Sequence, residues 1–408
     1  MAPITELAAR VETQASRRPV LLVLTLLVLL YGARQASRKM GDFEVYHRAA
    51  TRAVAGETTY RLSDPHRYLY APVVTFLFFP IAILPKTLGK VLWLAVNFAV
   101  IVSILRTSAK LLFPEGRAPP GFYALVLLLS ARFIDNNIGH GQINLVLLWL
   151  VLQAYSLARD GHFPAAGLAL SVAIATKIVP AVFLLQVLLQ RRWRFAAWTV
   201  LAFAVLMVVP ALWWGLAYPR LVQDWVAVVA DQAGHYDVGN KINQSISAFV
   251  YRLFELGDGQ TSVAASVLSV VIHACFVVPL IALSLRWGDK HANAPKSSQQ
   301  RGDELSLWLL YSTVAAPYSW KYYFANLMFP FAGATPRLWT EKHRRFEITL
   351  GVVFVLNLLA GVELPGDAAE MLLEAASLHF VAVVVLFVLL GLEALGRNPT
   401  EARSMDLH

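Results

Sequence analysis

The residues of this chain best suited to acid–base chemistry lie in the run Gly41-Asp42-Phe43-Glu44-Val45-Tyr46-His47, directly after the first apolar segment. A carboxylate at a membrane surface can act as a general base on a hydroxyl group presented there, because burial and neighbouring charges tune its pKa. Asp42 is our candidate for that base. The alternative is that Asp42 caps the helix that follows, since Asp is a favoured N-cap residue.

A second candidate is Lys177, which lies between two short apolar stretches, 163–176 and 178–189, with no acidic residue nearby in sequence. A lysine in such a place needs a partner, and a phosphate group is one. The alternative is a side chain that extends to the lipid headgroups and has no ligand.

Polar residues also cluster from Arg132 to Asn144, at the start of an apolar stretch that reaches about Leu157. Polar groups at membrane depth are costly and are usually kept for a cavity or a pathway. The alternative is a polar turn in which Gln142 and Asn144 bond between helices. Three apolar stretches separate Asp42 from this cluster, which places the two on opposite sides of a membrane unless one stretch fails to cross.

Two later polar segments offer groups that bind sugars and phosphates. Asn243, Gln244 and Arg252 lie in the connection 215–261, where they would equally well make an ordinary capped loop. The segment 317–324 combines a lysine with four aromatic residues and would suit stacking against a sugar or anchoring at the membrane interface: Tyr318, Trp320, Lys321, Tyr322 and Tyr323.

The composition identifies the elements that must position these groups. The chain has 408 residues, of which 57% are hydrophobic and 15% charged, and its mean hydropathy is +0.56. Soluble domains carry about 25% charged residues, so we expect an integral membrane protein. The net charge of +9 lies largely in short tracts between apolar segments, as the positive-inside rule predicts, and does not indicate a nucleic-acid partner. A single cysteine, Cys275, excludes a disulfide within the chain and a cysteine-based metal site.

We therefore predict one all-α polytopic membrane domain over residues 1–408. The expected topology has a cytoplasmic N-terminus over 1–19, an uncleaved first helix and an interfacial helix in the first external loop. The large external loops are predicted at 34–70 and 215–261, a cytoplasmic loop at 286–304 and a polar tail at 396–408.

A series of short motifs follows Asp42 along the chain. They are, in order, Ala55-Gly56-Glu57-Thr58-Thr59-Tyr60, Tyr68-Leu69-Tyr70-Ala71-Pro72, Gly141-Gln142-Ile143-Asn144, Thr176-Lys177-Ile178-Val179-Pro180, Asn243-Gln244-Ser245 and Pro317-Tyr318-Ser319-Trp320. Together with Asp42 they resemble glycosyltransferase family 87, and the resemblance covers about residues 40 to 335. The family includes polyprenyl-phosphate-mannose-dependent mannosyltransferases that extend phosphatidylinositol mannosides in actinobacteria.

The resemblance implies a GT-C-like bundle of about 10–12 transmembrane helices in the inner (plasma) membrane, with an outward-facing active site. It implies a lipid-linked sugar donor, a glycolipid or glycan acceptor, inversion at the anomeric carbon, and Asp42 as the base. Our candidates for the donor phosphate are Lys177, Arg252 and Lys321. Those for the sugar or acceptor are Glu44, His47, His66, Tyr70, Gln142, Asn144, Asn243, Gln244, Trp320 and Tyr322. We expect no cofactor and no required metal, because the first external loop offers no acidic pair at ligand spacing beyond Asp42 and Glu44.

Two other classes of protein remain open at this point. A transporter or flippase of a lipid-linked sugar would also have short broken segments and polar groups at mid-membrane. The two halves show no inverted repeat, and the polar residues gather in two long external loops, which favours an enzyme. A non-catalytic scaffold would leave the Asp42 loop unexplained.

Overall fold

The computed structural model describes residues 30–113, 117–119, 121–235, 237–256, 260, 262–286, 298–340, 344–359, 372 and 375–396. Over these residues the chain is helical and contains no strand. The prediction of an all-α membrane protein is confirmed. The predicted N-terminal segment 1–19, most of the first apolar helix and the tail beyond Gly396 lie outside the described residues.

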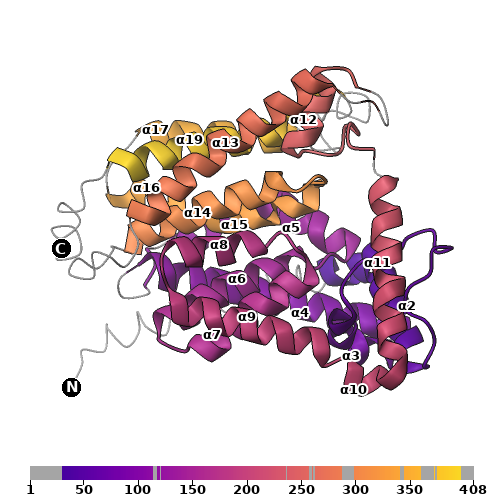
Figure 1. The fold of residues 1–408 in the computed structure, drawn as a ribbon. Coiled ribbons are helices and arrows are strands. Elements are labelled where there is room, and N and C mark those ends of the chain that lie inside the picture. The colour runs from indigo at the N-terminus through magenta and orange to yellow at the C-terminus, as the bar shows by residue number, and fades with distance from the viewer. Residues whose placement is uncertain are drawn as a thin grey trace, which may run out of the picture.

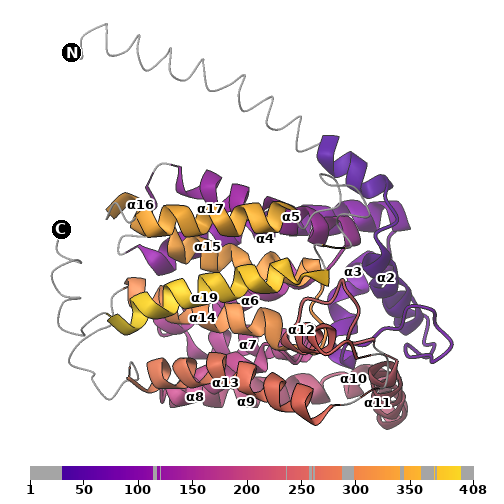
Figure 2. The same ribbon diagram turned by 90° about the horizontal axis from the view of Figure 1, so that it is seen from above.

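The long helices run side by side as one bundle, with the chain turning back at each end (Figure 1 and Figure 2). Their bounds are α4 Lys86–Leu112, α5 Phe122–His140, α6 Asn144–Arg159, α7 Phe163–Thr176, α8 Ala181–Leu189, α9 Trp193–Val208, α13 Val263–Arg286, α14 Ser298–Ala315, α15 Met328–Ala334, α17 Arg344–Leu359 and α19 Leu378–Gly396. Shorter elements join them: η1 Pro72–Phe78, α3 Phe79–Ala82, α10 Ala211–Trp214, η2 Gly215–Ala217, α12 Ile246–Leu253, η4 Lys321–Leu327 and α16 Arg337–Thr340.

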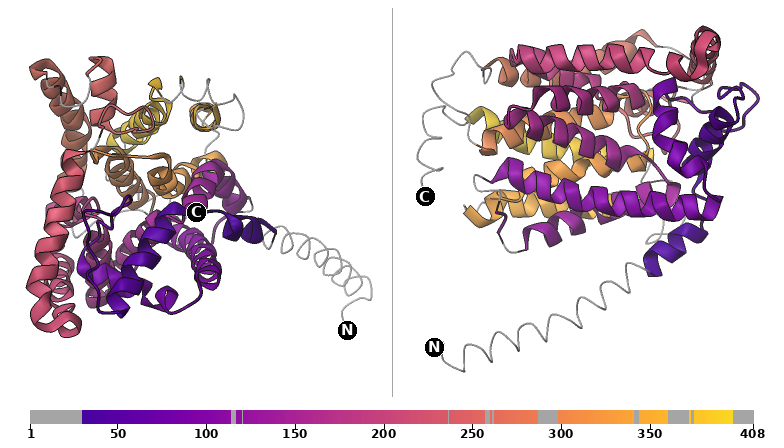
Figure 3. Two further views of the ribbon diagram at one scale, coloured as in Figure 1. Left: turned by 90° about the vertical axis from the view of Figure 1, so that its right-hand side faces the viewer. Right: turned by 90° about the horizontal axis from the view of Figure 1, so that it is seen from below.

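Two further helices, α2 (Gly41–Val54) and α11 (Tyr218–Gly234), lie at one end of the bundle, on the right in Figure 1. The end-on view in Figure 3 shows α11 running across the bundle rather than along it. Both helices have an apolar face and a polar face, as expected of helices at a membrane interface. We call this part of the molecule the α2 end.

Four helical segments are long and apolar enough to cross a membrane, or five if the bent pair α5 and α6 counts as one. The four are Lys86–Leu112, Trp193–Gly234, Val263–Arg286 and Leu378–Leu395, and α5 meets α6 at 118°. This number, for the described residues, is smaller than the ten to twelve expected. Several apolar stretches fold as helices that are too short: α7 has 14 residues, a length of about 21 Å against a hydrocarbon core of about 30 Å.

The stretch that fails to cross is the one after the first loop. Residues 72–82 form only the short elements η1 and α3, which pack beside α2. The chain then leaves the α2 end through α4 and returns through α5. Asp42 and Gln142 therefore lie at the same end, and the apparent conflict in the sequence is removed.

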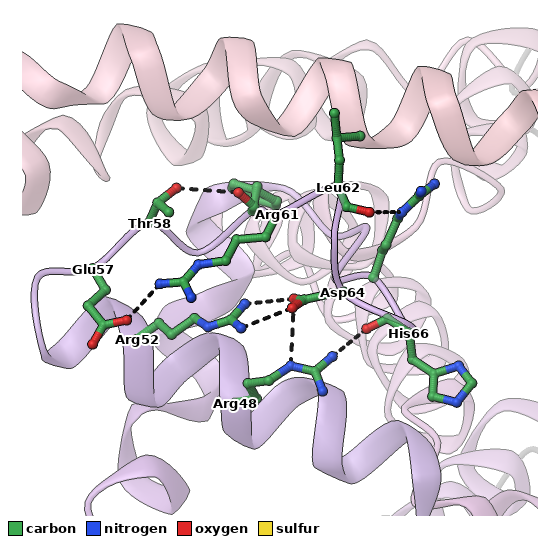
Figure 4. A network of polar contacts seen from close by, with 10 residues as sticks. Arg48, Arg52, Glu57, Thr58, Arg61, Leu62, Asp64 and His66 are labelled. Atoms are coloured by element: carbon green, nitrogen blue, oxygen red, sulfur yellow. Dashed lines mark hydrogen bonds and ion pairs between the residues drawn. The ribbon is translucent and has the colours of Figure 1, made fainter.

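The first loop is held against α2 by ion pairs (Figure 4). Arg52 donates both of its terminal nitrogens to Asp64, at 2.6 and 2.9 Å, and Arg48 lies 3.6 Å from the same carboxylate. Arg48 also donates to the backbone carbonyl of His66. These contacts fix the path of the chain towards Tyr70.

The predicted cytoplasmic loop 286–304 is in part a helix. Residues 298–304 form the first turns of α14, and Asp303 and Glu304 are buried there. One terminal nitrogen of Arg337 donates to both carboxylate oxygens of Asp303, each at 2.7 Å. This charge-assisted pairing explains why charged residues can enter the bundle at this point.

Candidate active site

Asp42 lies in the first turn of α2, but it does not cap the helix. The N-cap residue is Met40, which has φ 48° and forms no side-chain cap bond. The Asp42 carboxylate instead accepts a hydrogen bond from the side chain of Gln142, in the turn between α5 and α6. The alternative given by the sequence, a helix cap, is therefore wrong, and the carboxylate is directed towards the bundle.

Burial raises the pKa of Asp42 above its ordinary value, and this effect outweighs the opposing ones. The hydrogen bond from Gln142 and the positive charges of Lys177, His140 and His66 act in the other direction. A carboxylate with a raised pKa holds a proton more readily than an exposed one, which suits a general base.

The turn that carries Gln142 is locked onto α2. Gly141 has φ +72°, and a Cβ atom on it would lie 2.7 Å from Cβ of Phe43, the residue after Asp42. Trp93 donates its indole N–H to the carbonyl of Gly141 at 3.0 Å. Only glycine fits both the backbone conformation and the close approach.

Lys177 reaches the same end from the break between α7 and α8. Its ammonium group donates to Oδ1 of Asn144 at 2.8 Å and lies 4.1 Å from the ring centroid of Tyr323. Burial lowers the pKa of Lys177 to about 7, and the charge of Asp42 opposes this shift. Asp42 is therefore hydrogen-bonded to the neutral amide of Gln142 and Lys177 to the neutral amide of Asn144. The two charged groups interact with each other electrostatically, without a direct hydrogen bond between these two side chains.

Lys177 lines a small cleft, which holds about 30 Å³ of space for water-sized molecules and is partly open to the outside. Asn144, Lys177 and Tyr323 form its polar part. Its remaining walls come from α6, α8, α14 and neighbouring residues and are mostly apolar: Leu147, Leu148, Val151, Val179, Pro180, Phe183, Leu309, Ser312 and Asn326. The cleft offers one cationic group beside a largely apolar channel.

The structure brings together about half of the residues predicted from the sequence. Asp42, His66, Tyr70, Gln142, Asn144, Lys177 and Tyr322 all contact or act electrostatically on members of this cluster. Three members were missed: Tyr46, His140 and Tyr323. Tyr46 is four residues after Asp42 on a helix, and this spacing places both on one face. His140 directly precedes the motif that starts at Gly141, and Tyr323 directly follows Tyr322. A motif one residue longer would have included each of them.

Glu44 lies on α2 but pairs with a residue outside this cluster, whereas His47, on the same helix, has a buried Nε2 with no hydrogen-bond partner among the residues that the structure describes. Glu44 forms an ion pair with Lys86 at 2.8 Å. Burial acts to raise the pKa of Glu44, but the hydrogen bond and charge of Lys86 outweigh it, and the pKa is lowered. Nδ1 of His47 lies 3.5 Å from the hydroxyl of Thr51, one turn further along the same helix.

Asn243, Gln244 and Arg252 hold two backbone segments together. Asn243 accepts from the N–H of Ser319 at 2.9 Å and donates to the carbonyl of Pro317 at 2.9 Å. The backbone N–H of Gln244 donates to Ser319 at 2.8 Å. Arg252 donates to the Asn243 carbonyl at 2.8 Å and to other acceptors nearby. These bonds fix the start of the aromatic segment.

The aromatic segment forms a row of rings that leads to Lys177. Ring centroids are 6.0 Å apart between Tyr318 and Trp320, 5.6 Å between Trp320 and Tyr322, and 5.5 Å between Tyr322 and Tyr323. Lys321 lies half-buried at the first position of η4. The rings of Trp320 and Tyr322 are adjacent, and their predicted role as a surface for sugar stacking stays a prediction.

In the part of the chain that the structure describes, no three His, Cys, Asp or Glu side chains are grouped so as to hold a metal ion. The expectation that no metal is required remains a prediction.

Comparison with known proteins identifies the family. A family model described as "Glycosyltransferase family 87" matches residues 68–297, more than half of the chain. The chain belongs to this family. The match includes Gln142, Asn144 and Lys177, whereas Asp42 and α2 precede it.

Several mycobacterial proteins are similar to the chain over part of their length. A polyprenol-phosphate-mannose-dependent α-(1-2)-phosphatidylinositol pentamannoside mannosyltransferase of Mycobacterium tuberculosis is 27% identical over 57% of this chain and 53% of its own length. The Mycolicibacterium smegmatis protein of the same description is 24% identical over 65% and 60%. A phosphatidylinositol mannoside mannosyltransferase of M. smegmatis is 33% identical over 48% and 42%. The chain thus matches about half the length of these relatives.

Proposed function

We propose that this family 87 member transfers a hexose, mannose in the first instance, from a polyprenyl phosphate to a hydroxyl group of a membrane glycolipid or glycan. The observation that carries the proposal is the arrangement at the α2 end. Asp42 and Lys177, two charges from opposite halves of the site, are each hydrogen-bonded to a neutral amide beside an apolar cleft. A base and an anion-binding group near an apolar cleft match the needs of this reaction.

In the proposed reaction Asp42 removes the proton of the acceptor hydroxyl while the oxygen of that hydroxyl attacks the anomeric carbon of the donor sugar. The bond from that carbon to the phosphate oxygen breaks on the opposite face, so the configuration inverts. Polyprenyl monophosphate leaves with the bonding electron pair, and the acceptor proton ends on Asp42. The protonated Lys177, supported by Asn144, stabilises the negative charge that develops on the phosphate.

The cleft gives this assignment its lipid component. Its walls below Lys177 include Leu147, Val151 and Phe183. Apolar side chains favour hydrocarbon over water, at about 25 cal/mol per Å² of buried apolar area. The first prenyl units would occupy this channel while the phosphate meets Lys177.

The relatives supply the choice of donor. Their names specify polyprenol-phosphate-mannose and phosphatidylinositol mannosides, and from them we infer a mannose donor for this chain. The acceptor is proposed only as a glycolipid or glycan. We place the site at the outer face of the plasma membrane, where a lipid-linked sugar and an envelope glycolipid can meet.

The proposal is tested with purified protein in vesicles that contain polyprenyl-phosphate mannose and a lipid extract, with products identified by mass. We expect a new glycolipid one hexose heavier and the release of polyprenyl monophosphate. Asp42→Asn should lower turnover by about 10²–10⁴-fold, the usual contribution of general base catalysis.

The matched control is Glu44→Gln, which changes a carboxylate two residues away that pairs with Lys86, and it should keep its turnover. Movement of intact donor across the membrane without cleavage would replace the enzyme with a transporter. Full activity of Asp42→Asn would remove Asp42 as the base.

A further inference from the structure

A chain of hydrogen bonds lies next to Asp42. The hydroxyl groups of Tyr46 and Tyr70 are 2.9 Å apart, and the hydroxyl of Tyr46 donates to Oε1 of Gln142 at 3.3 Å. Tyr46 lies one turn after Asp42 on α2, and Gly141 packs against Phe43, so the Gln142 side chain is placed next to the Asp42 carboxylate, whose pKa it lowers by hydrogen bonding. Tyr46 and Gln142 are buried.

The direction of each bond in this chain is determined by the available protons. Tyr46 has one hydroxyl proton, and it is used in the bond to Gln142. The bond between the two tyrosines must then use the proton of Tyr70. Because Oε1 of Gln142 accepts from Tyr46, its NH₂ group is the part left for Asp42. The tyrosines therefore select the orientation of the amide.

The backbone of Gln142 is held on both sides. Its N–H donates to the carbonyl of Asn137 at 2.9 Å, and its own carbonyl accepts from the Asn137 side chain at 3.1 Å. The preceding residue, Gly141, is packed against Phe43 as described above. The amide thus has little freedom to follow a bound sugar.

We propose that Gln142 and Tyr46 are positioning residues for Asp42: Tyr70 and Tyr46 orient the Gln142 amide, whose NH₂ group faces the Asp42 carboxylate and fixes its orientation. This reassigns Gln142, for which the sequence suggested contact with the sugar or acceptor. The inference rests on the proposed function, in which Asp42 is the base.

The surroundings of Asp42 define what a pH measurement will report. It is faced by Lys177 from the α7–α8 break, His140 from α5, His66 from the first loop and Tyr323 from η4. Burial raises the pKa values of Tyr46 and Tyr70 well above their ordinary value, so both hydroxyls stay protonated over the working range. Loss of the Gln142 amide therefore changes the hydrogen bonding of Asp42 without changing any of these charges.

The experiment compares pH–rate profiles of transfer for the wild type, Gln142→Met and Tyr46→Phe. Removal of a hydrogen bond to the ionised form raises the pKa of a carboxyl group. Gln142→Met should move the acidic limb to higher pH by about one unit, which is about tenfold in rate on that limb, and the rate should approach that of the wild type at pH values above the shifted limb. Tyr46→Phe should move it in the same direction by about two- to threefold in rate, since the amide is kept but loses its orientation.

The matched control is Tyr155→Phe. Tyr155 also donates its hydroxyl to a buried glutamine, Gln186, but lies on α6 three turns away from Asn144. This variant should leave the profile unchanged. Infrared titration of the Asp42 carboxyl band, identified by its absence in Asp42→Asn, gives the same shift without relying on activity.

Two results would overturn the inference. One is a Gln142→Met variant whose rate falls equally at every pH and whose carboxyl band titrates as in the wild type. The other is an equal shift in Tyr46→Phe and Tyr155→Phe. The failure of the proposed function is a different outcome, namely an active Asp42→Asn.

Discussion

Buried charges occur at both ends of the bundle, and the two ends treat them differently. At the end opposite α2, where α16 lies on the left in Figure 1, Arg337 and Asp303 are almost completely buried. Both contacts between them are 2.7 Å long, and Arg337 also donates to the carbonyl of Gly333 at 2.9 Å. At the α2 end, Asp42 and Lys177 bond to the neutral side chains of Gln142 and Asn144.

The difference indicates what each pair is for. A fully hydrogen-bonded ion pair neutralises both of its members and is costly to break. It holds α14 to α16 and needs no ligand. Charges bonded to neutral amides keep part of their charge available, at a cost in stability. Such charges are suited to substrates with complementary groups: a phosphate for the ammonium group and a hydroxyl proton for the carboxylate.

A second buried carboxylate at the far end accepts from neutral groups of other helices, so neutral partners by themselves do not mark a binding site. Glu304 is buried next to Asp303, and its carboxylate accepts from Gln190 at 2.7 Å and from Ser284 at 2.8 Å. Ser284 also accepts from the indole N–H of Trp308 at 3.1 Å. This network ties α8, α13 and α14 together, which is a structural task.

The largest expected effect is on the paired end. Arg337→Met leaves Asp303 buried without its cation, and loss of one partner of a buried ion pair costs about 3–5 kcal/mol. We expect a strong fall in the thermal unfolding midpoint in detergent, with donor affinity unchanged in the folded fraction. The double variant Asp303→Leu/Arg337→Met should regain much of the loss. An unfolding curve like that of the wild type for the single variant would show that the pairing contributes little.

The second effect is on the unpaired end and has the opposite character. Lys177→Met should lower turnover by about 10²–10³-fold, the cost of removing one group that stabilises a developing anion. Its stability should be unchanged or increased, because a buried charge is replaced by a side chain of similar length.

The pH dependence of donor binding sharpens this prediction. Burial lowers the pKa of Lys177 to about 7, so the ammonium form that binds phosphate is lost as the pH rises through 7. Wild-type affinity for the donor should fall by up to about tenfold per pH unit above that point, whereas the affinity of Lys177→Met should be lower and flat. If Lys177→Met kept both the donor affinity of the wild type and its pH dependence, Lys177 would not be the group that binds the phosphate.

The smallest effect is expected in the first loop. Arg61 and Glu57 are paired at the surface, 2.7 Å apart, where ion pairs contribute about 0–1 kcal/mol and are screened by salt. Arg61→Gln should lower the free energy of unfolding by less than about 1 kcal/mol, and the difference should shrink at high ionic strength. A loss as large as that of Arg337→Met would end the distinction between surface and buried pairs.

Much of the fold class and some of the site followed from the sequence. The apolar composition predicted an all-α membrane protein, and an interfacial helix was predicted in the first external loop, where α2 lies. The motifs around Gln142 and Lys177 indicated the family and two residues of the candidate site. Each of these signals is local, because helix periodicity and short motifs depend on neighbouring residues.

The number of crossing helices did not follow, because hydropathy does not distinguish a spanning helix from a short helix packed at one end. Residues 72–82 are apolar yet form only η1 and α3. These elements pack against α2 and α4, and such contacts between different segments cannot be predicted from the composition.

The sequence by itself determined which residues can do chemistry: one carboxylate, one isolated lysine and a set of amides. Only the tertiary structure decided which of them meet. It placed Gln142 on Asp42 and Asn144 on Lys177, while it committed Asn243, Gln244 and Arg252 to holding the backbone. The physical reason is that a side chain's role depends on the hydrogen bonds left to it after folding, and those partners come from helices far apart in the chain.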